Sequence, residues 1–191
     1  MSMKPDFLST VLEKAAAFLT KPAALNAETF PLLLDPIKES LYNFIFKALG
    51  FCEDANDIYQ ETLLRAFKYR ESFHGPGSFK TWIFTIAHNE IKRYFNTSKK
   101  MVKPLDLEEH PGIAGNTVNG LEPRVRDIYR VAQQLTPRQR RVFFLFYDQR
   151  FPIAEISEIT GLKQGNVKFI LNQARQKIKQ KLAVTGDKNG E

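Results

Sequence analysis

Acidic side chains recur at intervals of three and four residues between positions 54 and 61. In a helix this spacing places Asp54, Asp57 and Glu61 on one face, where Leu64 continues the row and Gln60 borders it. An acidic stripe repels the phosphates of nucleic acid and suits a basic protein partner. The competing interpretation is a solvated face whose acids favour the helix N-terminus.

A second group of residues surrounds a turn of glycine and proline. The group comprises Phe73, His74, Phe79, Lys80 and Trp82, around Gly75-Pro76-Gly77. A rigid loop edged by aromatic rings and a cation can stack on an unpaired base. Aromatic residues also fill cores, and we expect Trp82 to be largely core.

The segment from Phe79 to about Asn96 is expected to be a helix with one polar face. That face carries His88, Asn89 and Lys92, and Arg93 lies beside it. Amides followed by cations suit contacts to a DNA duplex. We expect His88 to be a surface residue rather than a metal ligand or catalytic base, because no Cys, His or carboxylate shares its face.

The C-terminal part has the pattern of a helix-turn-helix. An apolar face over Ile153 to Thr160 is followed by Gly161, which can take the left-handed conformation of a tight turn, and then by a longer basic helix. The outward residues of that second helix are Gln164, Lys168, Phe169, Asn172, Arg175 and Gln176. From Thr136 to Val184 ten cations face three acids, so DNA binding is favoured over a hairpin with a solvated basic face.

Helical periodicity dominates the whole chain, so the predicted fold class is all-α. We expect two small helical domains joined by a flexible linker, with the helix-turn-helix in the second. The predicted boundaries are an N-terminal extension at 1–34, a first domain at 35–100, a linker at 101–123, a second domain at 124–184 and a tail at 185–191. The linker is rich in glycine and proline and has no sustained periodicity.

Composition excludes several classes of protein. The 191 residues carry a net charge of +7, with an isoelectric point near 9.5. Cys52 is the only cysteine, so neither an internal disulfide nor a Cys-x-x-Cys metal pair can form. No signal peptide or membrane-length apolar run is present, and a cytoplasmic location is expected. The phosphate-binding and hydrolase motifs of common enzymes are missing, so we predict no catalysis and no cofactor.

Five segments of the chain resemble the sigma-70 family of RNA polymerase sigma factors, of the extracytoplasmic-function type. In chain order they are residues 54–67, 78–89, 135–142, 154–161 and 165–168. The first two segments are similar to the core domain of that family. The last three are similar to its promoter-binding helix-turn-helix. The resemblance implies core RNA polymerase and promoter DNA as partners, and control by an anti-sigma protein.

The resemblance also implies roles for the residues identified above. Asp54, Asp57, Gln60, Glu61 and Leu64 would contact the polymerase. Phe73, His74, Phe79, Lys80 and Trp82 would open the −10 element, and His88, Asn89, Lys92 and Arg93 would contact its duplex. Gln164, Lys168, Phe169, Asn172, Arg175 and Gln176 would lie at the −35 element. Phe169-Ile170 stands where the family commonly has Ser-Arg, which implies a different −35 preference.

Two other functions remain open. A stand-alone helix-turn-helix regulator would need only the C-terminal motif, and it would use neither the acidic stripe nor the aromatic loop. A DNA-free adaptor would keep the fold in order to bind protein. The reduced number of cations on the recognition helix is compatible with that adaptor.

Overall fold

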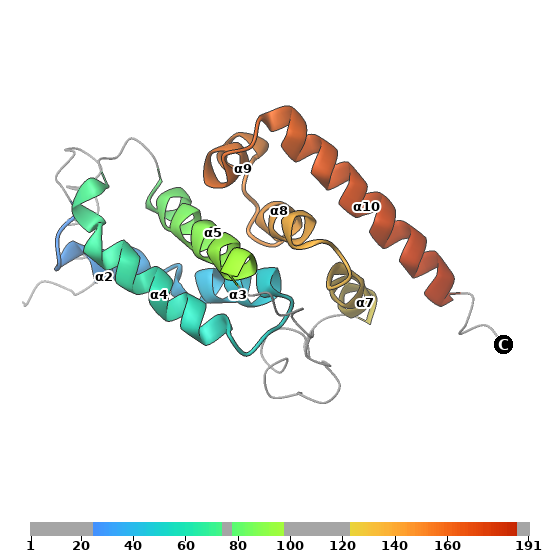
Figure 1. Ribbon diagram of the computed structural model, residues 1–191, viewed down its shortest axis with the longest axis horizontal. Coiled ribbons are helices and arrows are strands. Elements are labelled where there is room, and N and C mark those ends of the chain that lie inside the picture. Colours follow the sequence, from blue (N-terminus) through green and yellow to red (C-terminus); the bar gives the residue numbers. More distant parts are fainter. Residues whose placement is uncertain (1–24, 74–77, 98–122, 187–191) are drawn as a thin grey trace, which may run out of the picture.

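A computed structural model describes residues 25–73, 78–97 and 123–186, and all of its regular structure in these ranges is helical (Figure 1). The predicted all-α fold class is therefore confirmed for the described residues. The apolar spacing from Leu8 to Leu19 also predicts a helix within the N-terminal extension, and this segment lies outside the described ranges. The interior of the predicted linker and the segment from His74 to Gly77 lie outside them as well.

The N-terminal half contains α2 (Thr29–Leu34), α3 (Lys38–Leu49), α4 (Ala55–Lys68), the 3-10 helix η1 (Arg70–Ser72) and α5 (Phe79–Thr97). The sequence pattern predicts one helix from near Glu53 to about Ser72, and this prediction was wrong. The helix ends at Lys68, because the Arg70 guanidinium donates a hydrogen bond of 2.8 Å to the carbonyl of Phe67 and the chain then tightens into η1. The sequence did not reveal α2.

The C-terminal half contains α7 (Pro123–Ala132), α8 (Pro137–Tyr147), α9 (Ile153–Thr160) and α10 (Gln164–Gly186). The sequence Thr136-Pro137 predicts a helix start, with Thr136 as the N-cap. This start of α8 is confirmed, since Thr136 and Gln139 cap each other reciprocally and Pro137 occupies the first turn. Gly161 ends α9 at φ 68°, in the left-handed region. A side chain there would meet no atom within 4 Å, so the glycine is required by the backbone conformation alone.

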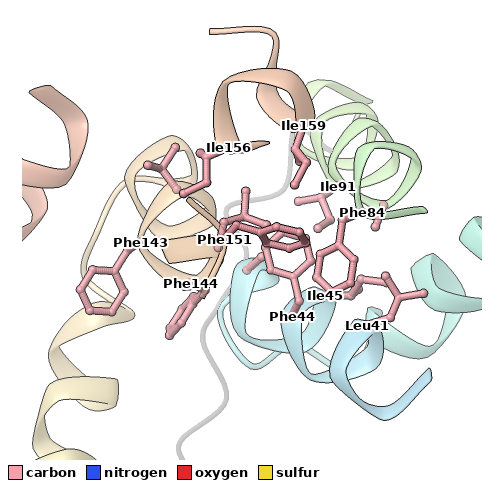
Figure 2. Close-up of a cluster of buried hydrophobic side chains, with 14 of the residues drawn as sticks. Leu41, Phe44, Ile45, Phe84, Ile91, Phe143, Phe144, Phe151, Ile156 and Ile159 are labelled. Carbon is pink, nitrogen blue, oxygen red and sulfur yellow. The ribbon is translucent and has the colours of Figure 1, made fainter. Parts of the chain in front are cut away.

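One continuous apolar core joins the two halves. Phe84 of α5 packs on Phe44 of α3, with ring centroids 5.2 Å apart, and on Phe151, with centroids 5.1 Å apart. Ile156 and Ile159 of α9 are fully buried in the same cluster. Figure 2 shows these side chains converging from α3 and α5 on one side and from α8 and α9 on the other. The described parts of the predicted domains therefore pack together.

Buried cations reinforce this contact between the halves. Lys47 of α3 forms a salt bridge of 2.5 Å with Asp148, which follows α8, and both side chains are nearly buried. Arg140 of α8 donates hydrogen bonds to the carbonyls of Ala48 and Leu49, at 2.9 and 3.1 Å. These carbonyls end α3 and have no partner within the helix, so Arg140 caps α3 from the other half of the protein.

Gly50 follows α3 at φ 93° and leaves room for Arg140. A Cβ at this position would lie 2.6 Å from Nη1 of Arg140. We expect Gly50→Ala to lower the free energy of unfolding by about 2 kcal/mol, because the substitution adds left-handed strain to a steric clash. Urea denaturation measures this effect. Gly165→Ala is the control, since a Cβ there would meet nothing within 4 Å and φ is not positive. An equal loss in both variants would contradict the explanation.

Candidate nucleic-acid interface

The predicted acidic stripe lies along α4, and most of it is exposed. Asp54, Asp57 and Gln60 are exposed, and 66% of the Leu64 surface is accessible to water. The carboxylate of Asp54 accepts a hydrogen bond of 2.5 Å from the Tyr94 hydroxyl of α5. An exposed acidic face of this kind suits a basic protein partner.

Glu61 differs from the rest of the stripe because its carboxylate forms ion pairs with two arginines. Arg65 and Arg93 approach it at 2.8 and 3.2 Å, and both also pair with the buried Glu90. Hydrogen bonds from Arg65 and then Arg93 hold the pKa of Glu61 below its usual value. Reversing the charge of Glu61 would therefore place three cations together, so Asp57 is the cleaner residue with which to test the stripe.

The aromatic residues around the predicted loop form a packed cluster. Phe73 and Phe79 are almost fully buried, while Trp82 is half-buried, and the three ring centroids are 5.4 to 5.9 Å apart. Phe30 of α2 packs edge-on against Phe79 at 5.9 Å, and the sequence did not identify this support. The cluster therefore fixes Trp82 in place. His74 lies outside the described residues.

The beginning of α5 is covered by the C-terminal half of the protein. The ammonium of Lys80 donates a hydrogen bond of 3.2 Å to the carbonyl of Gln149 and lies 4.7 Å from the ring centre of Phe151. Thr81 donates a hydrogen bond of 2.6 Å to Glu155 of α9. Burial lowers the pKa of Lys80. In this arrangement the Lys80 ammonium is bound to protein, although the side chain is only partly buried.

Farther along α5, the predicted polar face is split. Asn89, Lys92 and Arg93 are exposed, as duplex contacts require, although Arg93 is also tied to the carboxylates of Glu61 and Glu90. The expectation that His88 is a surface residue was wrong, because only 6% of it is exposed. The pKa of His88 is lowered to about 3. Burial is the largest cause, and the positive charges of Arg141 and Lys92 lower the pKa further. His88 is therefore neutral at physiological pH.

The outward residues predicted on α10 are all exposed. They are Gln164, Lys168, Phe169, Asn172, Arg175 and Gln176. Val167, Ile170 and Leu171 face the core, so the helix has separate buried and exposed faces. Arg175 is partly engaged, since its guanidinium donates a hydrogen bond of 2.5 Å to the Tyr147 hydroxyl. The turn between α9 and α10 is held by the Ser157 hydroxyl, which donates to the carbonyl of Leu162 at 2.5 Å.

Sequence reasoning missed an apolar groove of 480 Å³ between α7, α8 and α10. Its walls include Ile128 of α7, Phe143 of α8 and Ile178 of α10. These residues are far apart in the sequence, and each also fits an ordinary amphipathic helix. No local signal could have found the groove.

In the described residues, no group of His, Cys, Asp and Glu has the arrangement of a metal site. The helices in these ranges are also too short or too polar for any of them to cross a membrane. The described surfaces instead present an acidic face on α4 and a polar, cationic face on α10.

Two sequence families match the chain in the order of its two halves. Residues 34–101 match Sigma-70 region 2, and residues 125–178 match Sigma-70 region 4. These two matches place this helical chain, with its helix-turn-helix, among transcription factors. The chain belongs to the sigma-70 family, and its relatives include sigma factors of the extracytoplasmic-function type.

Individual relatives agree with this assignment. The chain is 27% identical to the ECF RNA polymerase sigma factor SigG of Mycobacterium tuberculosis, over 83% of this chain and 50% of SigG, so it spans about half the length of that relative. It is 28% identical to SigW of Bacillus subtilis, over 82% of this chain and 90% of SigW.

Solved structures share the fold. The sigma factor RpoE of Bartonella quintana, in complex with the anti-sigma factor NepR, matches with a TM-score of 0.67 at 22% identity, over 83% of this chain and 99% of RpoE. CnrH, in complex with the cytosolic domain of CnrY, matches with a TM-score of 0.62 at 19% identity, over 92% of this chain and 96% of CnrH.

Proposed function

We propose that the protein is a sigma factor that binds core RNA polymerase and directs it to specific promoters, where it recognises −35 and −10 elements and opens the −10 element. The observation that carries this proposal is that one chain holds both sigma-70 regions and exposes a different surface on each. The protein contributes recognition and no catalysis. It acts in the cytoplasm, where polymerase and promoter DNA are found.

The exposed surfaces support a division of roles. The stripe of Asp54, Asp57, Gln60 and Leu64 suits a basic surface of the polymerase, and Glu61 at its edge is available only if it exchanges partners. The −35 contacts fall to Gln164, Lys168, Phe169, Asn172, Arg175 and Gln176, which share the exposed face of α10.

The −10 contacts are assigned to α5 and to the aromatic cluster before it. Asn89, Lys92 and Arg93 are placed for the duplex, and the half-buried Trp82 is the most accessible ring of the cluster for an unstacked base. Phe73 and Phe79 support Trp82 from within the core. His74 stays a prediction from the sequence, and the buried His88 supports the helix rather than touching DNA in this arrangement.

Promoter binding through Lys80 requires the two halves to separate. In the described arrangement α9 lies against α5, and Lys80 and Thr81 are bonded to Gln149 and Glu155. We infer that binding to polymerase holds the halves apart and exposes the start of α5. Once both halves are bound to one polymerase, DNA binding by one half raises the effective concentration of promoter DNA at the other half.

An anti-sigma protein is proposed as the regulator. The sigma factor RpoE, whose fold matches this chain, was solved with the anti-sigma factor NepR, and CnrH, whose fold also matches, was solved with the cytosolic domain of CnrY. A regulator that binds only the closed arrangement would keep the protein inactive, because ligand binding favours the state it contacts. A pull-down of the full-length chain from its host, with mass spectrometry, identifies the partner.

Run-off transcription tests the proposed function. Purified core polymerase is mixed with the full-length protein and a pool of genomic fragments, and the transcripts are sequenced. We expect discrete start sites that share two spaced upstream motifs and vanish when the protein is omitted. If folded protein and active core yield no dependent transcripts, the proposal fails. DNA binding without polymerase would then favour a stand-alone regulator, and polymerase binding without transcripts would favour an adaptor.

A further inference from the structure

We infer that Phe169 is a specificity-determining residue whose ring packs against the 5-methyl group of a thymine in the −35 element. This inference rests on the proposed function and extends it, because it names the base and the chemical group that this chain recognises.

The first observation is the exposure of Phe169 on a helix whose buried face is already complete. The side chain is 61% exposed, whereas Val167, Ile170 and Leu171 are nearly or fully buried. Phe169 therefore contributes little to the core of the described structure. A single exposed aromatic residue is unremarkable on most surfaces. Evidence for a function of Phe169 must therefore come from its place on the helix.

The second observation is that position. Phe169 is the sixth residue of α10, and the first turns of a recognition helix are the part that reaches base edges. The next turn on this side presents the exposed amides of Asn172 and Gln173. Figure 1 places α10 on the side of α8 and α9 that faces away from α3, α4 and α5. The ring thus stays accessible even while the halves are closed.

The third observation is the groove that Phe169 borders. The groove has a volume of 430 Å³ and lies between the starts of α8 and α10. Its other walls are Thr136, Arg138, Gln139, Asn166, Ile170 and Gln173. Arg138 is an exposed cation suited to a phosphate, so the groove offers a backbone anchor on one side and an apolar ring on the other.

The chemistry of the major groove then selects the base. A phenyl ring has no hydrogen-bonding group, so it cannot read the donors and acceptors that distinguish the other bases. Thymine alone presents a methyl group in the major groove, and apolar contact with that methyl is a recognised mode of readout. Burying one methyl group corresponds to about a fourfold change in affinity, or about 0.8 kcal/mol.

The experiment compares thymine with uracil, which differs only by the methyl group. Two pools of promoter duplexes, randomised upstream of a fixed −10 region, are synthesised with thymidine or with deoxyuridine. Each pool is selected with holoenzyme assembled from core polymerase and the full-length chain. We expect a thymine to be enriched about fourfold or more at one −35 position in the first pool, and uracil not to be enriched there in the second.

Two variants assign this preference to a residue. Holoenzyme with Phe169→Ala is expected to lose the preference at that one position and to keep the rest of the −35 motif. The matched control, Lys168→Ala, is expected to weaken binding to all sequences alike while the thymine preference persists. Both residues are exposed, and circular dichroism together with core binding verifies that each variant is folded.

The outcomes separate the inference from the proposed function. Equal enrichment of thymine and uracil, or a preference that survives Phe169→Ala, overturns the assignment of Phe169 while leaving the sigma function intact. Loss of core binding by Phe169→Ala also overturns it, because the ring would then contact protein. If the wild-type holoenzyme enriches no upstream motif in either pool, both the inference and the proposed −35 recognition fail.

Discussion

Asp57→Arg is expected to weaken binding to core RNA polymerase about 100-fold or more. Asp57 is exposed in the middle of the α4 stripe. Placing a cation against a basic polymerase surface replaces an attraction with a repulsion, which costs several kcal/mol. The fluorescence anisotropy of labelled protein titrated with core polymerase measures the change.

The control for this prediction is Glu39→Arg. Glu39 is also exposed and lies in the first turn of α3, so its substitution makes the same change in net charge outside the stripe. We expect Glu39→Arg to retain core binding within a few-fold. Unchanged affinity of Asp57→Arg would contradict the proposed interface, and an equal loss in both variants would show that total charge, rather than the stripe, drives binding.

Asp148→Ala is expected to release the two halves of the protein from each other. Asp148 pairs with Lys47, whose side chain is 5% exposed, and also accepts a hydrogen bond of 2.9 Å from Tyr129. Removing one partner of a buried pair leaves the other charge unpaired, at a cost of roughly 3–5 kcal/mol. Opening the interface lets water reach Lys47, so the open arrangement becomes favoured. Small-angle X-ray scattering is expected to show a larger radius of gyration.

The double variant Lys47→Met with Asp148→Leu is the control for opening. Replacing both charges with apolar side chains removes the unpaired ammonium and is often neutral or stabilising, so the compact form is expected to return. A double-mutant cycle then gives the coupling between the two residues. If Asp148→Ala lowers the melting temperature without expanding the protein, the halves do not separate under these conditions and the proposed opening is wrong.

Local patterns predicted most of the elements and the surface residues of α10. The apolar spacing of Val167, Ile170 and Leu171 identified the buried face of the recognition helix, and Thr136-Pro137 identified the start of α8. These features are predictable because helix periodicity and capping depend on residues within one or two turns. The early end of α4 was not predictable in this way, because the cap from Arg70 ends the helix where the apolar pattern continues.

The candidate site was less predictable than the fold. His88 lies on a polar helical face by spacing, yet it is buried with a pKa near 3. Glu61 and Arg93 were assigned to different partners, yet they form an ion pair of 3.2 Å. Periodicity shows which residues share a face of one helix. It does not show which helix covers that face.

The sequence by itself determined most of the helices, though not α2 or the end of α4, together with the acidic stripe on α4 and the helix-turn-helix with Gly161 at its turn. Only the tertiary structure decided that Lys47 meets Asp148 and that Arg140 caps the end of α3. The physical reason is the range of the forces involved. Propensity and capping act between neighbours in the chain, whereas the burial of a cation depends on an acceptor brought from about 90 to 100 residues away.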